Sequence, residues 1–135
     1  MEPRYLLDTN IVIYIRQKKP EDLLRRFQKL REGEAAISVI TLGELIYGAR
    51  KSTPGVSALE RLQELLMLIP ALPLPERAAA SYGKIRAELE IKGEMIGNND
   101  LWIASHALAA DLILVTNDEN EFRRVQGLKI QNWAS

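Results

Sequence analysis

The sequence predicts an α/β fold with a mainly parallel central sheet and helices on both of its faces. Short apolar runs that end in polar residues alternate along the chain with stretches of helical periodicity, an alternation typical of β-α-β units. No internal repeat, linker or low-complexity segment interrupts it. A chain of 135 residues also suits one domain. We therefore expect residues 1–135 to form a single α/β domain.

The N-terminal segments set the pattern. Residues 5–7 form a short apolar run that stops at Asp8, which predicts a buried strand followed by polar residues. The apolar run 11–15 predicts a short helix with Asn10 as its N-cap. A helix over 20–31 follows, because this range opens with proline and its apolar residues recur every three or four positions.

The middle of the chain continues the alternation. The apolar run 36–39 predicts a second strand, and the next helix is expected over 41–50. The Ser-Thr-Pro-Gly sequence at 52–55 predicts a turn. Apolar residues at helical spacing predict a helix over 59–69, which Pro70 ends because proline lacks the amide hydrogen that a helix needs.

The second half of the chain repeats the pattern. Residues 72–75 carry two prolines, so they predict only a brief strand of edge type. The apolar run 112–115 is the clearest buried strand of the sequence, and it stops at Thr116. The remaining elements are expected as helices over 76–92, 100–110 and 121–125 and a last strand over 129–131.

Composition excludes several classes of protein. The chain has no cysteine, which excludes disulfide scaffolds, zinc fingers and thiol nucleophiles. Lys and Arg number 18, as do Asp and Glu, so the formal net charge is zero and nucleic acid would have to bind a local patch. The N-terminus lacks the features of a signal peptide, and no apolar run approaches the ~18 residues of a membrane span. We expect a cytoplasmic protein without membrane contact.

Four carboxylates stand at predicted strand ends or helix starts: Asp8, Glu44, Asp100 and Asp118. Parallel strands bring their carboxyl ends to one edge of the sheet, where α/β folds bind ligands. Each of these acids also has a purely structural explanation. Asp8 could close a turn, and Asp100 could interact with a helix dipole. Glu44 and Asp118 could belong to helix-capping boxes.

Taken together, the four acids favour a metal site. Carboxylates that cluster without a neighbouring cation repel one another, which a fold avoids unless a cation lies among them. Mg²⁺ and Mn²⁺ take oxygen ligands, and such an ion activates water and neutralises charge on a phosphodiester. Nearby hydroxyl and amide side chains could orient the acids by hydrogen bonds. These are Thr9, Asn10, Asn99, Thr116 and Asn117. The pattern predicts metal-dependent phosphodiester hydrolysis.

Four segments of the chain resemble a PIN-domain ribonuclease, and in particular the VapC toxins of toxin–antitoxin pairs. They are YLLDTN at 5–10, SVITLGEL at 38–45, NDLWIA at 99–104 and LVTNDENEF at 114–122. Each motif is short and weak by itself. The four together are specific, because they occur in family order from the first residues of the chain almost to the last.

The resemblance implies a fold, an activity and partners. The fold is an α/β/α sandwich with an acidic pocket for one or two Mg²⁺ or Mn²⁺ ions. The activity is RNA cleavage by an endoribonuclease toxin. The partners are RNA, a second copy of the chain and a small VapB-like antitoxin, in a heterotetramer or a larger complex. The alternative is a catalytically weak PIN module that binds RNA without cutting it, and an intact acidic set argues against that alternative.

The resemblance also assigns site residues. The first three acids named above match the first three acidic positions of the family. The fourth position falls on Asp118 or Glu121. We favour Asp118, because it is closer to the strand end, and place Glu121 outside the ligand set. Thr116 matches the hydroxyl that orients the first aspartate, Asp8.

Other conspicuous side chains are expected to pack. His106 lies six residues after Asp100, on another side of the predicted helix, so it does not point where Asp100 points. As the single histidine it also argues against a Ser-His-Asp triad. Trp133 is expected to anchor the last strand, and Trp102 to bury its helix, although Trp102 could instead stack on a base.

Two surface features stay open. The basic runs at 16–19 and 25–26 are expected on a solvated helix face, or along the rim of the acidic groove, where they would bind RNA phosphates. The predicted helix 59–69 and residues 45–47 carry more apolar surface than a small domain needs. This surface either packs in the core or forms a dimer or antitoxin interface.

Overall fold

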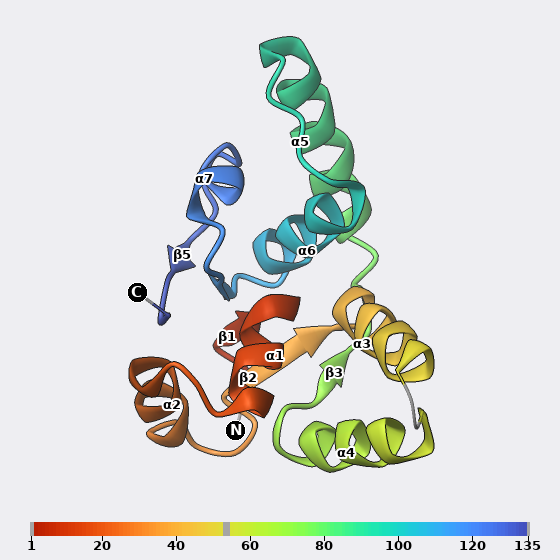
Figure 1. The fold of residues 1–135 in the computed structure, drawn as a ribbon. Coiled ribbons are helices and arrows are strands. Elements are labelled where there is room, and N and C mark those ends of the chain that lie inside the picture. Colours follow the sequence, from red (N-terminus) through yellow and green to blue (C-terminus); the bar gives the residue numbers. More distant parts are fainter. Residues whose placement is uncertain (1, 53–54, 135) are drawn as a thin grey trace.

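The computed structural model describes residues 2–52 and 55–134. Within this part of the chain, five strands form one parallel sheet in the spatial order β3-β2-β1-β4-β5 (Figure 1). The strands are β1 (Tyr5–Leu7), β2 (Ala35–Ser38), β3 (Ala71–Leu72), β4 (Ile113–Val115) and β5 (Ile130–Gln131). The predicted α/β fold with a mainly parallel sheet is confirmed. Positions 53 and 54 of the predicted turn lie outside the described residues.

Helices alternate with these strands as predicted, with bounds that differ by a few residues. They are α1 (Thr9–Gln17), α2 (Glu21–Gln28), α3 (Val39–Lys51), α4 (Gly55–Leu68), α5 (Ala78–Lys92), α6 (Asn98–Ala109) and α7 (Glu119–Phe122). In Figure 1, α5 extends away from the sheet, the chain then returns alongside α5, and α6 lies between the base of α5 and the sheet. No helix of the described residues is long and apolar enough to cross a membrane.

The sheet separates two apolar cores, which makes the fold an α/β/α sandwich. Side chains alternate along β1, so Tyr5 and Leu7 pack with α1, α2, α3 and α4 on one face, and Leu6 packs with α5, α6 and α7 on the other. Trp133 closes the first core, with its ring edge-on to Tyr5 at a centroid distance of 5.0 Å. The sandwich implied by the resemblance and the packing role of Trp133 are both confirmed.

The predicted N-cap of α1, Asn10, is wrong. The helix begins directly after Asp8, whose backbone is extended and whose carboxylate accepts a hydrogen bond from the Thr9 amide at 2.8 Å. A short carboxylate at the end of β1 therefore caps the helix, and no residue is left over for a turn. Asn10 lies exposed inside the first turn of α1.

The bounds of β2 to β5 also differ from those predicted, and two of these differences have a local cause. β2 ends at Ser38 rather than at 39, because the Ser38 hydroxyl accepts from the Ile40 amide at 3.1 Å and so starts α3 at Val39. β3 covers Ala71–Leu72 instead of 72–75. It ends before the two prolines that follow, neither of which can donate to the ladder.

The apolar surface of α4 is divided between core and solvent. Leu62 and Ile69 are buried in the first core, as the packing alternative expects. Met67 and Leu68 are exposed, with 77% and 54% of their surfaces accessible. On α3, Tyr47 is 66% exposed, whereas Leu45 belongs to the core. Of the described side chains named here, Met67, Leu68 and Tyr47 are accessible to a partner.

The order of the strands creates one edge where ligands can bind. The chain winds from β1 through β2 to β3, and then crosses to β4 on the other side of β1. Leu7 and Val115 are therefore direct neighbours, although they are far apart in the sequence. At such a switch point the connections leave in opposite directions and open a crevice at the carboxyl ends of the strands. Asp8 follows β1 and Thr116 follows β4 at this crevice.

Candidate active site

Asp8 is the buried centre of the site, with 5% of its surface exposed. One carboxylate oxygen accepts from the Thr9 amide at 2.8 Å, and the other accepts from the Thr116 hydroxyl at 2.8 Å. Burial raises the pKa of Asp8, the two hydrogen bonds lower it, and the charges of Glu44 and Asp118 raise it further, for a net increase. The predicted contact between Thr116 and the first aspartate is present, and it fixes the orientation of the carboxylate.

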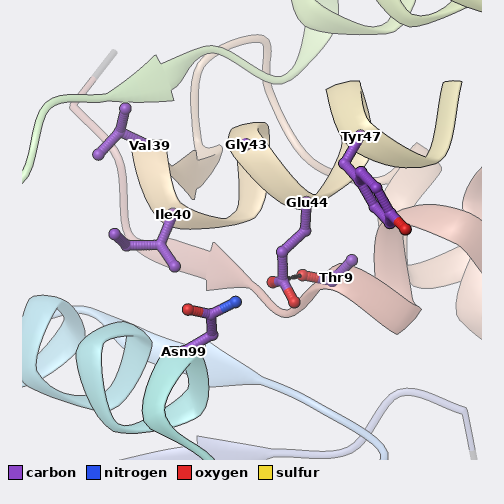
Figure 2. A pocket seen from close by; sticks show the side chains of 7 residues that line it. All are labelled: Thr9, Val39, Ile40, Gly43, Glu44, Tyr47 and Asn99. Atoms are coloured by element: carbon purple, nitrogen blue, oxygen red, sulfur yellow. Dashed lines mark hydrogen bonds between the residues drawn. The ribbon is translucent and has the colours of Figure 1, made fainter. Parts of the chain in front are cut away.

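Glu44 faces Asp8 from α3. Its Oε1 accepts from the Thr9 hydroxyl at 2.7 Å, and that hydroxyl also lies 3.3 Å from the hydroxyl of Thr41. The capping-box explanation of Glu44 is wrong, because Ser38 caps α3 and Thr41 is the third residue inside the helix. Glu44 is therefore directed to the sheet edge, where Figure 2 shows it bonded to Thr9.

Asp100 lies in the first turn of α6 and contacts a second carboxylate, Glu121. Burial, a hydrogen bond with Glu121 and the charges of Glu121, Asp8 and Glu44 raise the pKa of Asp100 to about 7. Glu121 also accepts from the Gly97 amide at 3.0 Å. A Cβ added at Gly97 would lie 3.6 Å from Asp100 Oδ2 and 3.8 Å from Glu121 Oε1. The two acids thus meet just before α6.

Asp118 lies at the start of α7, and its side chain is exposed to solvent. Its Oδ1 accepts from the Glu121 amide at 3.4 Å, and its own amide donates to the Thr116 hydroxyl at 3.0 Å. It is thus the N-cap of α7, as the structural explanation expects. The box is not closed, because the Glu121 carboxylate binds Gly97 instead. Asp118 also acts electrostatically on Asp8.

The amide side chains beside the acids differ in their placement. Asn99 is exposed at the start of α6 and lines a cavity with Glu44. Asn10 forms no side-chain hydrogen bond with another described residue, so nothing fixes its orientation there. Asn117 donates to the Tyr14 hydroxyl at 3.0 Å, while its Oδ1 is buried without a partner among the described residues.

His106 and Trp102 pack, as predicted. His106 is 1% exposed, and its Nδ1 lies 2.8 Å from the Ser38 hydroxyl, away from the acids. Burial lowers its pKa, which keeps the ring neutral. Trp102 stacks on Tyr82 with a centroid distance of 3.8 Å and an interplanar angle of 16°.

The acids therefore come from four segments, namely the two central strand ends, the second turn of α3 and the first turn of α6, to one edge of the sheet. A family model described as the PIN domain matches residues 5–128 of this sequence. The chain belongs to the PIN-domain family. The prediction that it is a nuclease of this family is confirmed, and the matched range includes every acid of the predicted site.

Within the PIN family, the chain is similar to VapC proteins along nearly its whole length. It is 42% identical over 131 residues to "Ribonuclease VapC2" of Haemophilus influenzae, an alignment that covers 97% of this chain and 98% of the relative. It is 41% identical over 131 residues to "tRNA(fMet)-specific endonuclease VapC" of Shigella flexneri, again with 97% and 98% covered. The resemblance to VapC toxins is thereby confirmed.

Solved structures show the same likeness in three dimensions. VapBC of Salmonella typhimurium bound to DNA contains a chain that superposes with a TM-score of 0.90 at 40% identity, covering 97% of this chain and 98% of that one. VapBC2 of Rickettsia felis bound to a promoter DNA fragment gives 0.88 at 40% identity, covering 96% and 98%. These PIN structures confirm the α/β/α architecture.

The acids of the predicted site fit a hard divalent cation, because their donor atoms are oxygens. They are Asp8, Glu44, Asp100, Asp118 and Glu121. All are carboxylates, and none forms an ion pair with another described residue. The raised pKa of Asp8 and that of Asp100 show that negative charge is unfavourable here, which a cation would relieve. No three acids of the described residues lie close enough together to hold an ion as their side chains stand. Binding therefore requires that the side chains draw together.

Two cavities of this PIN fold flank Glu44. The larger, of about 720 Å³, lies between α3 and the start of α6, and Figure 2 shows Asn99 facing Glu44 and Thr9 across it. Gly43 and Tyr47 line its α3 wall. Sequence reasoning did not assign these two residues to the site. Their spacing of four residues on a helix, with Glu44 between them, is the signal that could have found them.

Proposed function

We propose that this PIN protein is a Mg²⁺-dependent endoribonuclease, with Mn²⁺ able to replace Mg²⁺, and that it acts as the toxin of a VapBC-type toxin–antitoxin pair. The observation that carries the proposal is that Asp8, Glu44 and Asp100 lie at one sheet edge, where the charges of these acids raise the pKa of Asp8 and that of Asp100, without a cationic partner among the described residues. The VapC relatives support the choice of RNA as substrate, because they are named ribonucleases.

The proposed ligands are Asp8, Glu44 and Asp100, with Asp118 as the fourth and Glu121 supporting Asp100. When bound, a divalent ion supplies an activated water and neutralises charge that develops on the phosphodiester. The chain's own part is to hold the ligands. Hydrogen bonds at both oxygens fix Asp8, and the Thr9 hydroxyl holds Glu44.

The Asp100–Glu121 pair controls protonation of the site. With the pKa of Asp100 at about 7, this carboxyl holds a proton in roughly half of the molecules at neutral pH. The proton must leave before Asp100 can act as a ligand, because a protonated carboxyl is a poor one. We therefore propose that activity rises with pH through this range.

Relatives also suggest the RNA and the partners. Two VapC relatives are named as specific for tRNA(fMet), so this tRNA is the first substrate to test. Solved relatives contain VapB together with VapC, which supports a VapB-like antitoxin as partner, with a VapC homodimer in a heterotetramer or larger complex. A cytoplasmic location is part of the proposal, because the proposed RNA substrates are found there.

A PIN module that binds RNA without cutting it is the alternative. One observation favours it, since no three acids of the described residues are close enough to hold an ion as they stand. Cleavage assays distinguish the two functions directly. The alternative predicts RNA binding without any metal-dependent product.

The test is cleavage of tRNA(fMet) by purified protein with Mg²⁺. Asp8→Asn and Asp100→Asn should each lower the rate at least about a hundredfold, because a lost ligand removes both ion placement and water activation. Asp111→Asn is the matched control, since Asp111 is exposed, pairs with Lys129, and has a positive φ that Asn also tolerates. Asp118→Asn and Glu121→Gln in the same assay identify the fourth ligand. Full activity of Asp8→Asn would contradict the proposal.

A further inference from the structure

A second cavity, of about 240 Å³, adjoins the acids through Thr9 and Glu44. These two residues line it together with residues of α1, α3 and α4, and among the described residues they are the ones that it shares with the larger cavity. Small residues, Gly48, Ala49 and Ala58, form part of its wall and leave room inside. The cavity therefore extends the acidic edge towards α4.

Two arginines line this cavity from opposite helices. Arg16 comes from the last turn of α1, and Arg61 comes from α4. Neither forms an ion pair with a described carboxylate. Arg61 donates to the Ser57 hydroxyl at 2.9 Å, a neutral partner that leaves its charge uncompensated. The cavity thus combines two guanidinium groups that lack a counterion with a wall that carries Glu44.

The other arginines of the basic runs are engaged elsewhere. Arg25 pairs with Asp22 at 2.7 Å. Arg26 lies 5.0 Å above the ring of Trp133 and donates to Gln131 at 3.1 Å. Of the arginines in the two runs, Arg16 is thus the one that lines a cavity together with Glu44. Of these arginines, Arg16 is therefore the one that lies where the second expectation puts the basic runs, beside the acidic groove.

The charge distribution calls for such cations. An RNA phosphate that approaches the acids is repelled by them, and a chain with zero formal net charge offers no overall attractive field. Cations beside the acids compensate this repulsion and hold the backbone in place. Guanidinium groups suit the task, because their fork of donors matches two phosphate oxygens.

We propose that Arg16 and Arg61 form a phosphate subsite for the RNA backbone. It lies next to the position of the phosphate that would be cleaved at the acids. The subsite rests on the proposed function in that its ligand is the RNA substrate. It assigns positioning roles to both arginines, which bind substrate but take no part in bond cleavage. A protein partner with a carboxylate in the same cavity is the competing occupant.

Binding of fluorescein-labelled RNA, measured by anisotropy over a series of KCl concentrations, tests the subsite. All proteins carry Asp100→Asn to suppress cleavage. Arg16→Gln and Arg61→Gln together should weaken binding roughly tenfold, and each should reduce the slope of log K against log[KCl] by about 0.7, the value for one released counterion on a single strand. Lysine at both positions should restore the slope, since it keeps the charge.

Arg25→Gln is the matched control, because Arg25 is ion-paired on the surface and should not alter the slope. Melting temperatures check that each variant is folded. An unchanged slope in the double variant, or an equal change in Arg25→Gln, overturns the subsite. Unchanged RNA binding combined with weaker inhibition by the cognate antitoxin also overturns it and assigns the cavity to protein. Absence of RNA cleavage by the wild type contradicts the proposed function instead, and the binding series is read independently of that result.

Discussion

Asp100 is a single residue whose protonation the fold alters strongly. Its pKa is about 7 against an ordinary 3.8, because it is half-buried and faces Glu121. The native protein therefore holds a proton that the unfolded chain has already released between these pH values. A raised carboxyl pKa contributes stability that is fully present below about pH 4 and is lost as the pH rises through about 7.

In the absence of metal, the unfolding free energy of the wild type should fall between about pH 5 and pH 8. We expect this fall to be larger than that of Asp100→Asn over the same range. The difference should be on the order of 1–2 kcal/mol, after solvent screening of this half-buried group is allowed for. Urea unfolding in EDTA at both pH values measures it. Glu121→Gln should move the loss to lower pH, because Glu121 supplies two of the influences that raise the pKa of Asp100. Parallel pH profiles for wild type and Asp100→Asn would contradict this account.

The sequence could predict the positions of single residues only where a strand end fixed them. Asp8 and Thr116 follow β1 and β4, so the rule for parallel strands places them together, and they form a hydrogen bond. The contact of Glu121 with Asp100 has no such rule. It depends on how α7 is rotated when Phe122 packs into the second core, and no local pattern encodes that rotation.

Two helices, α3 and α6, carry Glu44 and Asp100. One buried hydrogen bond joins the start of α3 to α6. The Ser38 hydroxyl caps α3 and lies 2.8 Å from His106 Nδ1 on α6. Both side chains are buried, so each loses its polar partner if the other is removed. This link fixes the start of α3 against the last turn of α6.

We expect Ser38→Ala to cost about 2–3 kcal/mol of unfolding free energy, from a lost cap and an unpaired imidazole nitrogen. His106→Leu should also destabilise the protein. Because the two residues share one bond, the double variant should be less unstable than the sum of the single ones by about 1 kcal/mol. Urea unfolding of the four proteins measures this coupling. Ser52→Ala, whose hydroxyl bonds within α3, is the control and should be additive with His106→Leu. Additive effects of Ser38 and His106 would contradict the link.

The alternation of strands and helices was predictable because apolar periodicity and prolines act locally. The bounds of the elements were less predictable, because they depend on which side chains cap the helices. Asp8 and Ser38 each end a strand segment and begin a helix with no turn between, which the apolar runs alone do not reveal. The cavities were not predictable at all. Arg16 and Arg61 belong to different helices, and only the packing of α1 and α4 against α3 brings them to one cavity.

For the whole molecule, zero net charge combines with a local excess of carboxylates at the β1/β4 edge. This field favours a basic side chain of a partner as well as a metal ion. We expect inhibition by the antitoxin to depend on an Arg or Lys that reaches the acids. Its replacement by Ala should weaken inhibition of RNA cleavage at least about tenfold, measured by titration of antitoxin against a fixed amount of enzyme. Undiminished inhibition would place the blocking contact elsewhere.

Metal binding should couple to the stability of the whole fold, because only the folded chain brings the acids to one edge. A divalent ion at a hundredfold excess over its dissociation constant stabilises the native state by about 2.7 kcal/mol, which corresponds to roughly 10 °C in melting temperature. Asp8→Asn isolates this effect. Asparagine also serves as an N-cap, so α1 keeps its cap while the site loses one charge.

We therefore expect Asp8→Asn to be as stable as the wild type, or more stable, in EDTA, and to lose most of the rise with Mn²⁺. Asp8→Ala removes the cap as well and should cost about 1 kcal/mol at every metal concentration. Asp111 pairs with Lys129 and is not one of the acids of the site, so Asp111→Asn should respond to Mn²⁺ as the wild type does. Melting curves of the four proteins with EDTA and with excess Mn²⁺ measure these differences. A wild type indifferent to Mn²⁺, with Asp8→Asn simply less stable, would mean that Asp8 serves the fold alone.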